Sequence, residues 1–161
     1  MPESDVTFIP EDHAPAHRPK SLLPWLLLAL VIAAVVTPLL LSGRAKDIVA
    51  WNSDFADATL QARTAHKPVL VNFTAEWCPP CQDMKREVYS RVSVKDAIES
   101  QVIAVKIDLT DPSANSKSLA MWYRVEFLPT IIIVDADGKE LSRREGFLSE
   151  AQMLEWLQTV R

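Results

Sequence analysis

The sequence predicts an α/β domain that follows a single membrane-spanning helix. Three observations lead to this prediction. An uncharged apolar stretch occupies residues 22–41, and strand-like and helix-like segments alternate from residue 51 onward. The third observation is the sequence WCPPC at residues 77–81, which holds the only two cysteines of the 161-residue chain and lies between a strand-like and a helix-like segment.

The amino-terminal region divides into three parts. Residues 1–21 are polar and rich in proline, so we expect a disordered tail. Residues 22–41 carry no charge over about 20 positions, the length of a helix that spans a bilayer's hydrocarbon core. A core helix would show a polar face, and a signal peptide has a shorter apolar region, although small residues near Gly43 leave a cleaved signal peptide as an alternative. We expect residues 42–50 to form a linker.

Charge excludes one class of function and leaves the membrane orientation open. The net charge is −4 and no basic stretch alternates with the tryptophans, which argues against nucleic-acid binding. Arg18 and Lys20 precede the apolar stretch, and Arg44 and Lys46 follow it. Because the two sides carry equal positive charge, the flanking residues do not decide which side faces the cytoplasm.

Residues 51–161 have the pattern of one globular domain. Short β-branched runs predict strands, apolar residues at helical spacing predict helices, and Ser149 with Gln152 forms a capping box. In chain order we expect a helix within residues 51–66, capped by Ser53 or Asp54, then a strand over 69–74 and the cysteine pair. A helix from 82 to 88 that continues toward 98, a strand over 102–109 and a helix over 116–123 follow. Strands over 130–134 and 140–145, joined by a turn, and a last helix from 150 complete the domain.

The two cysteines favour a redox centre over two alternatives. A zinc site needs about four ligands, and the histidines, at positions 13, 17 and 66, supply no second pair. A purely structural disulfide across so short a loop would contribute little, because loop-closure entropy grows with loop length. A cysteine pair between a strand and a helix is typical of a redox dithiol. At the start of that helix, unsatisfied amides and the helix dipole would lower the pKa of Cys78, and Cys81 should be more buried.

Two motifs resemble the thioredoxin superfamily. They are AEWCPPC at residues 75–81, directly after a buried strand, and FLPT at residues 127–130, before a strand–turn–strand–helix ending. The resemblance covers about residues 51–160 and implies the thioredoxin fold, a mixed sheet flanked by helices. Residues 67–78, 86–98 and 108–110 are most similar to the C-terminal periplasmic domain of the thiol:disulfide interchange protein DsbD.

The resemblance also implies roles for individual residues. Cys78 and Cys81 would form the redox-active disulfide. Pro129 resembles the cis-proline that lies against the dithiol, with Leu128 and Thr130 beside it, and its alternative is a simple strand-start proline. Trp77 resembles the tryptophan that shields the site and binds substrate, and its alternative is a core residue.

Further positions would tune the chemistry. Pro79 and Pro80 stand where thioredoxin has Gly-Pro, and the extra proline removes one amide donor that could stabilise the Cys78 thiolate. Asn72 replaces a buried aspartate, and because an amide takes no proton, Cys81 must lose its proton through water or another group. Glu76 should be a solvated neighbour with a modest electrostatic effect. Lys106 matches a partly buried lysine of thioredoxins, with a surface lysine as the alternative.

The sequence therefore predicts a membrane-tethered, stand-alone thiol:disulfide oxidoreductase. We expect it to reduce disulfides of client proteins in the periplasm or another extracytoplasmic space, supplied with electrons by a membrane-embedded or soluble thiol donor. No cofactor, metal or nucleic acid is expected. The alternatives are a dithiol oxidase or isomerase on the same fold, and a non-catalytic adaptor that binds clients.

Overall fold

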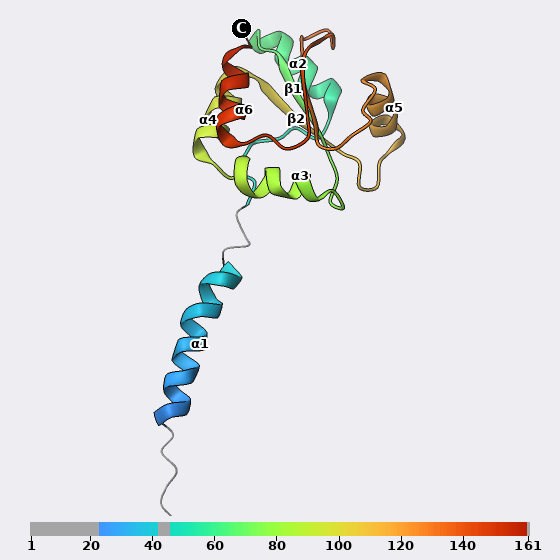
Figure 1. The fold of residues 1–161 in the computed structure, drawn as a ribbon. Helices are drawn as coiled ribbons and strands as arrows, with labels where there is room; N and C mark the ends of the chain where they lie inside the picture. Colours follow the sequence, from blue (N-terminus) through green and yellow to red (C-terminus); the bar gives the residue numbers. More distant parts are fainter. Residues whose placement is uncertain (1–22, 42–45, 161) are drawn as a thin grey trace, which may run out of the picture. The chain divides into compact units, whose positions relative to one another are not determined.

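A computed structural model describes residues 23–41 and 46–160, which belong to two separate compact units. The first contains α1, Leu23–Leu41 (Figure 1). The large apolar side chains between Leu23 and Val36 are exposed. By length and hydropathy, none of the described helices qualifies as a membrane crossing. The membrane span thus stays a prediction from the sequence, and the expected tail and residues 42–45 of the expected linker lie outside the described residues.

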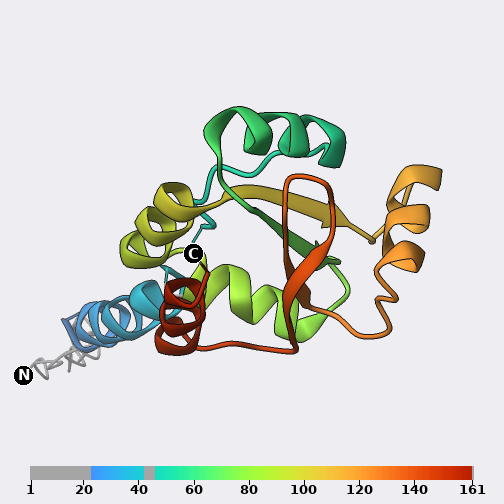
Figure 2. The same cartoon turned by 90° about the horizontal axis from the view of Figure 1, so that it is seen from above.

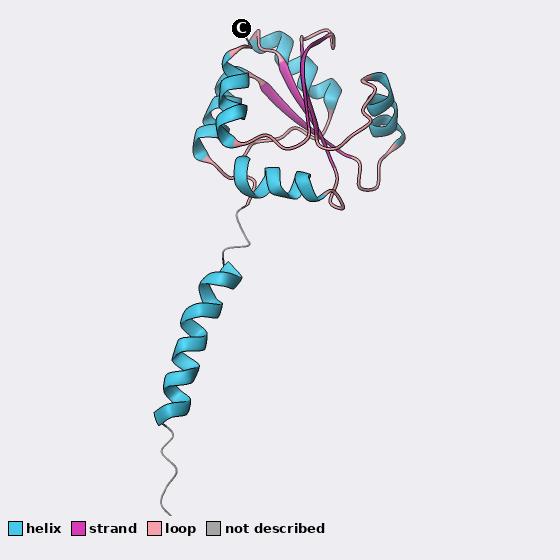
Figure 3. Cartoon of the chain, viewed as in Figure 1, coloured by secondary structure: helices cyan, strands magenta, loops and turns pink. Residues whose placement is uncertain are grey.

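The second unit is built on a mixed four-stranded sheet (Figure 3). Its strands are β1 Val69–Thr74, β2 Ile103–Asp108, β3 Thr130–Val134 and β4 Glu140–Glu145, in the order β2-β1-β3-β4. β1 runs parallel to β2 and antiparallel to β3, and β3 is antiparallel to β4. The central strands β1 and β3 are buried because helices cover both faces of the sheet.

Alternation along β1 and β3 divides the core into two layers. Leu70, Ile131 and Ile133 pack with η1 Met84–Val88, which directly follows α3 Pro79–Asp83, and with α4 Val92–Gln101 and α6 Glu150–Gln158. Val71, Phe73 and Ile132 pack on the other face with α2 Phe55–Ala65 and with Tyr123 at the end of α5 Ala114–Trp122. Figure 2 shows the sheet between α2 on one side and α3 with α6 on the other.

Most of the predicted elements are confirmed. Strands 69–74, 130–134 and 140–145 have the expected bounds, Asp54 caps α2, and the Ser149–Gln152 capping box is present. The expectation of one helix from 82 toward 98 is wrong. The chain turns at Tyr89–Arg91 and starts α4 at Val92, and the preceding turn is a π-helix in which the Tyr89 N–H donates to the Met84 carbonyl at 2.9 Å.

The segment just before α2 is packed against the domain. The Ile48 N–H donates to the Tyr89 carbonyl at 3.0 Å, and Val49 is buried in the core. Asn52 continues beside β2, with its N–H donating to the Ala104 carbonyl at 2.9 Å. Residues 47–50, which the sequence assigned to a linker, therefore form a strap that packs against Tyr89 and α4 and leads to the edge strand β2.

Candidate active site

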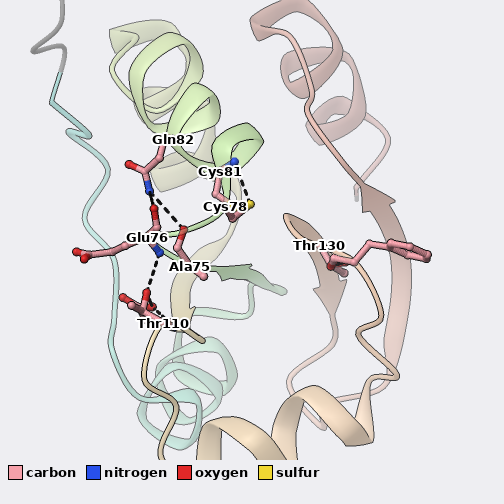
Figure 4. Close-up of a disulfide and its surroundings, with 9 residues drawn as sticks. Ala75, Glu76, Cys78, Cys81, Gln82, Thr110 and Thr130 are labelled. Carbon is pink, nitrogen blue, oxygen red and sulfur yellow. Dashed lines mark hydrogen bonds between the residues drawn. A yellow bond between two sulfur atoms is a disulfide. The ribbon is translucent and has the colours of Figure 1, made fainter.

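The dithiol lies at the junction between the end of β1 and the start of α3. Cys78 is the N-cap residue of α3 with extended backbone, and Pro79 and Pro80 occupy the first two helical positions, where proline is tolerated. Cys81 follows one turn along, and the two sulfurs form a disulfide with a Cα–Cα distance of 5.3 Å (Figure 4). The two sulfurs therefore lie near the carboxyl end of β1, a central strand of the sheet.

One amide donates to the Cys78 sulfur. The Cys81 N–H approaches Sγ of Cys78 at 3.2 Å, in the position of an N-cap hydrogen bond. Pro79 and Pro80 have no N–H to add. When the disulfide is reduced, this amide and the positive end of the helix dipole favour the thiolate of Cys78, which is the reactive form.

Both cysteines are buried to the same extent. Each is 3% exposed, with Ala75 and Leu128 packed against them. The expectation that Cys81 is more buried than Cys78 is wrong for this disulfide-bonded state, because the loop that covers the pair packs over both sulfurs.

Hydrogen bonds fix the loop before Cys78 (Figure 4). The Gln82 amide donates to the carbonyls of Ala75 at 3.3 Å and Glu76 at 3.2 Å, and the Glu76 N–H donates to the Thr110 hydroxyl at 2.7 Å. Asp108 in turn accepts from the N–H of Thr110 at 2.8 Å. Sequence reasoning missed Gln82 and Thr110 as supports, although residues 108–110 belong to one of the runs that carried the resemblance. The side chain of Glu76 is exposed, as expected.

The loop before β3 contacts the dithiol. Its Leu128–Pro129 peptide is cis, and Leu128 packs against the two cysteines. The Thr130 hydroxyl donates to the Phe127 carbonyl at 2.7 Å, and the Pro129 carbonyl accepts from the Gly146 N–H at 2.8 Å. Within the described part of the chain, neither backbone group of Leu128 has a hydrogen-bond partner.

Two aromatic residues beside these loops are exposed. Trp77 is 64% exposed and Phe127 is 65% exposed. The alternative that Trp77 is a core residue is therefore excluded. The sequence did not single out Phe127 for its side chain.

Comparison with known proteins identifies the family. A family model described as a thioredoxin-like domain matches residues 55–161. This chain belongs to the thioredoxin-like domain family. It is homologous to the thiol:disulfide interchange protein DsbD, with 33% identity over 93 residues to the protein of Actinobacillus pleuropneumoniae, which is 56% of this chain and 16% of that protein. The protein of Pseudoalteromonas atlantica is 32% identical over 104 residues, 63% of this chain and 17% of the relative.

Solved structures agree with the family. The oxidised C-terminal domain of Neisseria meningitidis DsbD is similar with a TM-score of 0.58 and 26% identity, over 70% of this chain and 100% of that one. A thioredoxin from Thermus thermophilus is similar with a TM-score of 0.61 and 26% identity, over 69% of this chain and 85% of that one. The match thus spans about a sixth of the curated relatives' length, at their thioredoxin-like domain. The chain has the thioredoxin fold and the Cys-x-x-Cys pair of a disulfide oxidoreductase.

The thioredoxin-like domain has a small polar cavity next to Cys81. Its volume is about 70 Å³, and Asn72, Tyr89, Lys106 and Asp47 contribute to its lining. Lys106 forms an ion pair with Asp47, whose side chain is only 7% exposed, so the alternative of a plain surface lysine at 106 is wrong. Sequence reasoning missed Asp47 and Tyr89, which it had placed in a linker and in a continuous helix.

A wider groove of about 900 Å³ lies elsewhere, beside α5 and the β3–β4 turn. Tyr123 in its wall donates from its hydroxyl to the Gly138 carbonyl at 2.7 Å, and burial, together with the charges of Glu140 and Asp135, raises the pKa of Tyr123 to about 12. The groove contains no cysteine, so we place the chemistry at the smaller cavity. Among residues 23–41 and 46–160, no three His, Cys, Asp or Glu side chains gather as metal ligands would.

Proposed function

We propose that this protein is a membrane-tethered oxidoreductase that reduces disulfides of extracytoplasmic client proteins. The observation that carries the proposal is the Cys78–Cys81 disulfide at the start of α3, faced by Leu128 of the cis-proline loop. Homology to a protein named for thiol:disulfide interchange supports the reaction class. Reduction is the direction that this resemblance favours.

In the proposed reaction, the reduced dithiol transfers two electrons to a client disulfide. The Cys78 thiolate attacks one client sulfur, which breaks the client disulfide and forms a mixed disulfide. Cys81 then attacks Cys78, forms the Cys78–Cys81 disulfide and releases the reduced client. A thiol donor reduces the enzyme again, so no cofactor enters the cycle.

The client would bind as an extended chain across the cis-proline loop. The unpaired backbone groups of Leu128 offer a hydrogen-bonding edge, which is the usual way that an extended peptide adds to an exposed strand or loop. Trp77 precedes Cys78 and Phe127 precedes Leu128 in the chain, and their exposed rings would cover apolar client side chains. Thr130 and Pro129 are buried and would hold the edge in place.

The membrane part of the proposal rests on residues 22–41. They carry no charge, and the apolar side chains of α1 are exposed and need an apolar environment. We propose that this segment anchors the chain with the thioredoxin-like domain outside the cytoplasm, where disulfides persist. A tether would keep the domain near a membrane-embedded electron donor.

The reduction potential of the full chain in detergent micelles tests the direction. Equilibration with glutathione redox buffers, followed by alkylation of free thiols, gives the fraction of reduced Cys78–Cys81 at each ratio. We expect a potential below about −230 mV, in the range of reducing thioredoxins. A potential near that of a strong dithiol oxidant, about −120 mV, would contradict a reductase and favour the oxidase.

A further inference from the structure

The cavity next to Cys81 contains two buried polar atoms that lack partners. Asn72 and Tyr89 are each 2% exposed, and neither the Asn72 Oδ1 nor the Tyr89 hydroxyl has a hydrogen-bond partner among the described residues. Both side chains line the same cavity as Cys81. Its volume of about 70 Å³ exceeds the roughly 10–15 Å³ that one water needs by this kind of measure, and its polar lining offers several hydrogen bonds. Water bridging these groups would satisfy both orphan atoms.

A carboxylate lies on the same cavity and is held firmly. Asp47 accepts from the Trp51 indole N–H at 2.9 Å and from the Val49 N–H at 3.1 Å, and it is paired with Lys106. The strap of residues 47–50 places it beside Lys106 of β2. These bonds orient its oxygens while keeping it away from bulk solvent.

Tyr89 lines the same cavity as the Asp47 carboxylate. Burial raises the pKa of Tyr89 above its ordinary value, and the negative charge of Asp47 raises it further. Trp51 packs edge-on against the Tyr89 ring with centroids 5.0 Å apart. Tyr89, Trp51 and Asp47 thus form one packed group behind the dithiol.

We propose that Asp47 accepts, through water in this cavity, the proton that Cys81 loses when it resolves the mixed disulfide. The inference rests on the proposed function, because resolution is its second step. Asn72, which occupies the strand position of an acidic residue in relatives by resemblance, then serves as a hydrogen-bonding wall of the path and takes no proton. Asp47 acts through water on Cys81 and is therefore a positioning and proton-accepting group that does not touch the client.

During resolution, the Cys81 proton and the client sulfur leave by separate routes. The Cys81 S–H bond breaks, and its proton passes through water to the Asp47 carboxylate. The Cys81 thiolate attacks the Cys78 sulfur, the Cys78–Cys81 bond forms, and the client sulfur leaves as a thiolate that takes a proton from solvent. The proton on Asp47 returns to solvent afterwards. Two electrons leave the enzyme dithiol and reduce the client.

Four other charged residues line the cavity, and three of them are exposed to solvent. Glu76 lies in the loop after β1, Lys85 on η1 and Asp108 at the end of β2, and all border the cavity, while Lys106 faces Asp47 from within β2. Glu76, Lys85 and Asp108 are exposed, so solvent screens their charges. Among the carboxylates on the cavity, Asp47 is the one that the fold shields from solvent.

Stopped-flow kinetics of the full chain in detergent micelles tests the proposal. The reduced protein is mixed with a bis-nitrobenzoate disulfide, which releases a coloured thiolate once when Cys78 attacks and once when Cys81 resolves. In Asp47→Asn we expect the first phase to keep its rate and the second to slow by on the order of 100-fold at neutral pH. The second phase of the variant should also rise about tenfold per pH unit below the thiol pKa, because Cys81 must then ionise to solvent.

Rescue separates proton transfer from packing. The double variant Asp47→Asn/Asn72→Asp returns a carboxylate to the same cavity and should restore most of the second-phase rate. Asp137→Asn is the matched control. It removes an exposed ion pair in which Asp137 lies 2.7 Å from Arg63, and neither residue lines the cavity. Both phases of this variant should stay at wild-type rates.

Asn72→Leu covers the case in which Asp47→Asn does not fold. It removes a buried polar atom without a partner and puts an apolar side chain into the wall of the proposed water path, so the protein should fold and its second phase should slow at least tenfold. An unchanged second phase in folded Asp47→Asn, or in Asn72→Leu if Asp47→Asn fails to fold, overturns the proposal. A missing first phase in the wild type would instead contradict the proposed function.

Discussion

At the scale of single residues, the two prolines after Cys78 set how strongly its thiolate is stabilised. An N-cap side chain accepts from the amides of the second or third helical residue. The second helical residue is Pro80, so the third, Cys81, is the donor that the structure shows, at 3.2 Å. The Gly-Pro pair of thioredoxin, which this sequence resembles, has the same proline at the second place.

We predict that Pro80→Ala lowers the pKa of Cys78. The alanine adds an N–H at the second helical position, and a hydrogen bond to a charged group is worth about 1.5–3 kcal/mol, which corresponds to a pKa lower by about one to two. The pH dependence of Cys78 alkylation, read by mass spectrometry on the reduced full chain, gives the midpoint. Pro79→Ala, at the first helical position, is the matched comparison and should give a smaller shift. Equal midpoints for wild type and Pro80→Ala would show that the added amide does not reach the sulfur.

The order of reaction of the two thiols is a second residue-level prediction. Cys78 caps the helix and should be alkylated well below the pH at which a free thiol reacts, while Cys81 lags because its sulfur is one turn inside α3. Limited alkylation followed by peptide mapping measures both rates on one sample. Equal rates across pH would contradict the assignment of Cys78 as nucleophile.

At the scale of elements, β4 is attached to the domain by its backbone pairing with β3 and by a network of charged side chains. Arg143 donates to Glu140 at 3.0 and 2.8 Å, to Glu145 at 3.1 Å and to the Tyr123 carbonyl at 2.5 Å. The hydrogen bond from Arg143 holds the pKa of Glu140 below its ordinary value, and Glu140 and Glu145 together raise the pKa of Arg143. This network ties the edge strand to the end of α5.

We predict that Glu140→Gln destabilises the protein in a pH-dependent way. Because the folded-state pKa of Glu140 is lowered, its contribution is present above the unfolded-state pKa and is lost as the pH falls through the folded-state value. At neutral pH the loss should be at most about 1 kcal/mol, since the pair is partly exposed. Urea unfolding at neutral pH and near pH 3 measures it. A difference between variant and wild type that does not shrink in acid would contradict this origin.

The sequence predicted the strands better than it predicted the helices that follow Cys81, η1 and α4. Apolar runs such as residues 130–134 leave little choice of structure, and their bounds agree with the observed strands. The π-helix at Met84–Val88 left no mark in the periodicity, because one extra residue in a turn depends on tertiary contacts. One such contact is the Leu148 N–H, which donates to the Met84 sulfur at 3.2 Å.

The candidate site could be predicted only where local motifs define it. Cys78, Cys81 and the Pro129 loop lie in short recognisable sequences. Asp47 lies 34 positions before Cys81, in a stretch without periodicity, and only the folded strap brings it to the cavity. No sequence motif links Asp47 to Cys81. A polar residue that reaches the site only through the tertiary fold therefore cannot be predicted from local sequence.

At the scale of the whole molecule, the proposed anchor would decide where the chemistry takes place. We predict that the full chain fractionates with membranes and resists alkaline extraction. Replacing Leu30 and Ala33 by lysine should release it, since a lysine near the centre of a membrane helix costs about 2.5–3.5 kcal/mol. Lysine at the exposed positions Leu60 and Gln61 of α2 is the control. Alkaline extraction of the unaltered chain would contradict the anchor.

The orientation has its own test. A reporter enzyme that is active only outside the cytoplasm, fused after Arg161, should be active. Activity of a cytoplasm-only reporter at the same junction would reverse the proposed topology, while the dithiol chemistry would be unaffected.

The central claim, that the Cys78–Cys81 dithiol reduces client disulfides, is tested most directly by trapping. Full-length Cys81→Ala cannot resolve the mixed disulfide, so clients should stay bound to Cys78 and be released by a reducing agent. The account predicts such adducts with Cys81→Ala and none with Cys78→Ala/Cys81→Ala. Clients that stay associated to the same extent in the double variant, without a disulfide, would contradict it and point to a non-catalytic adaptor.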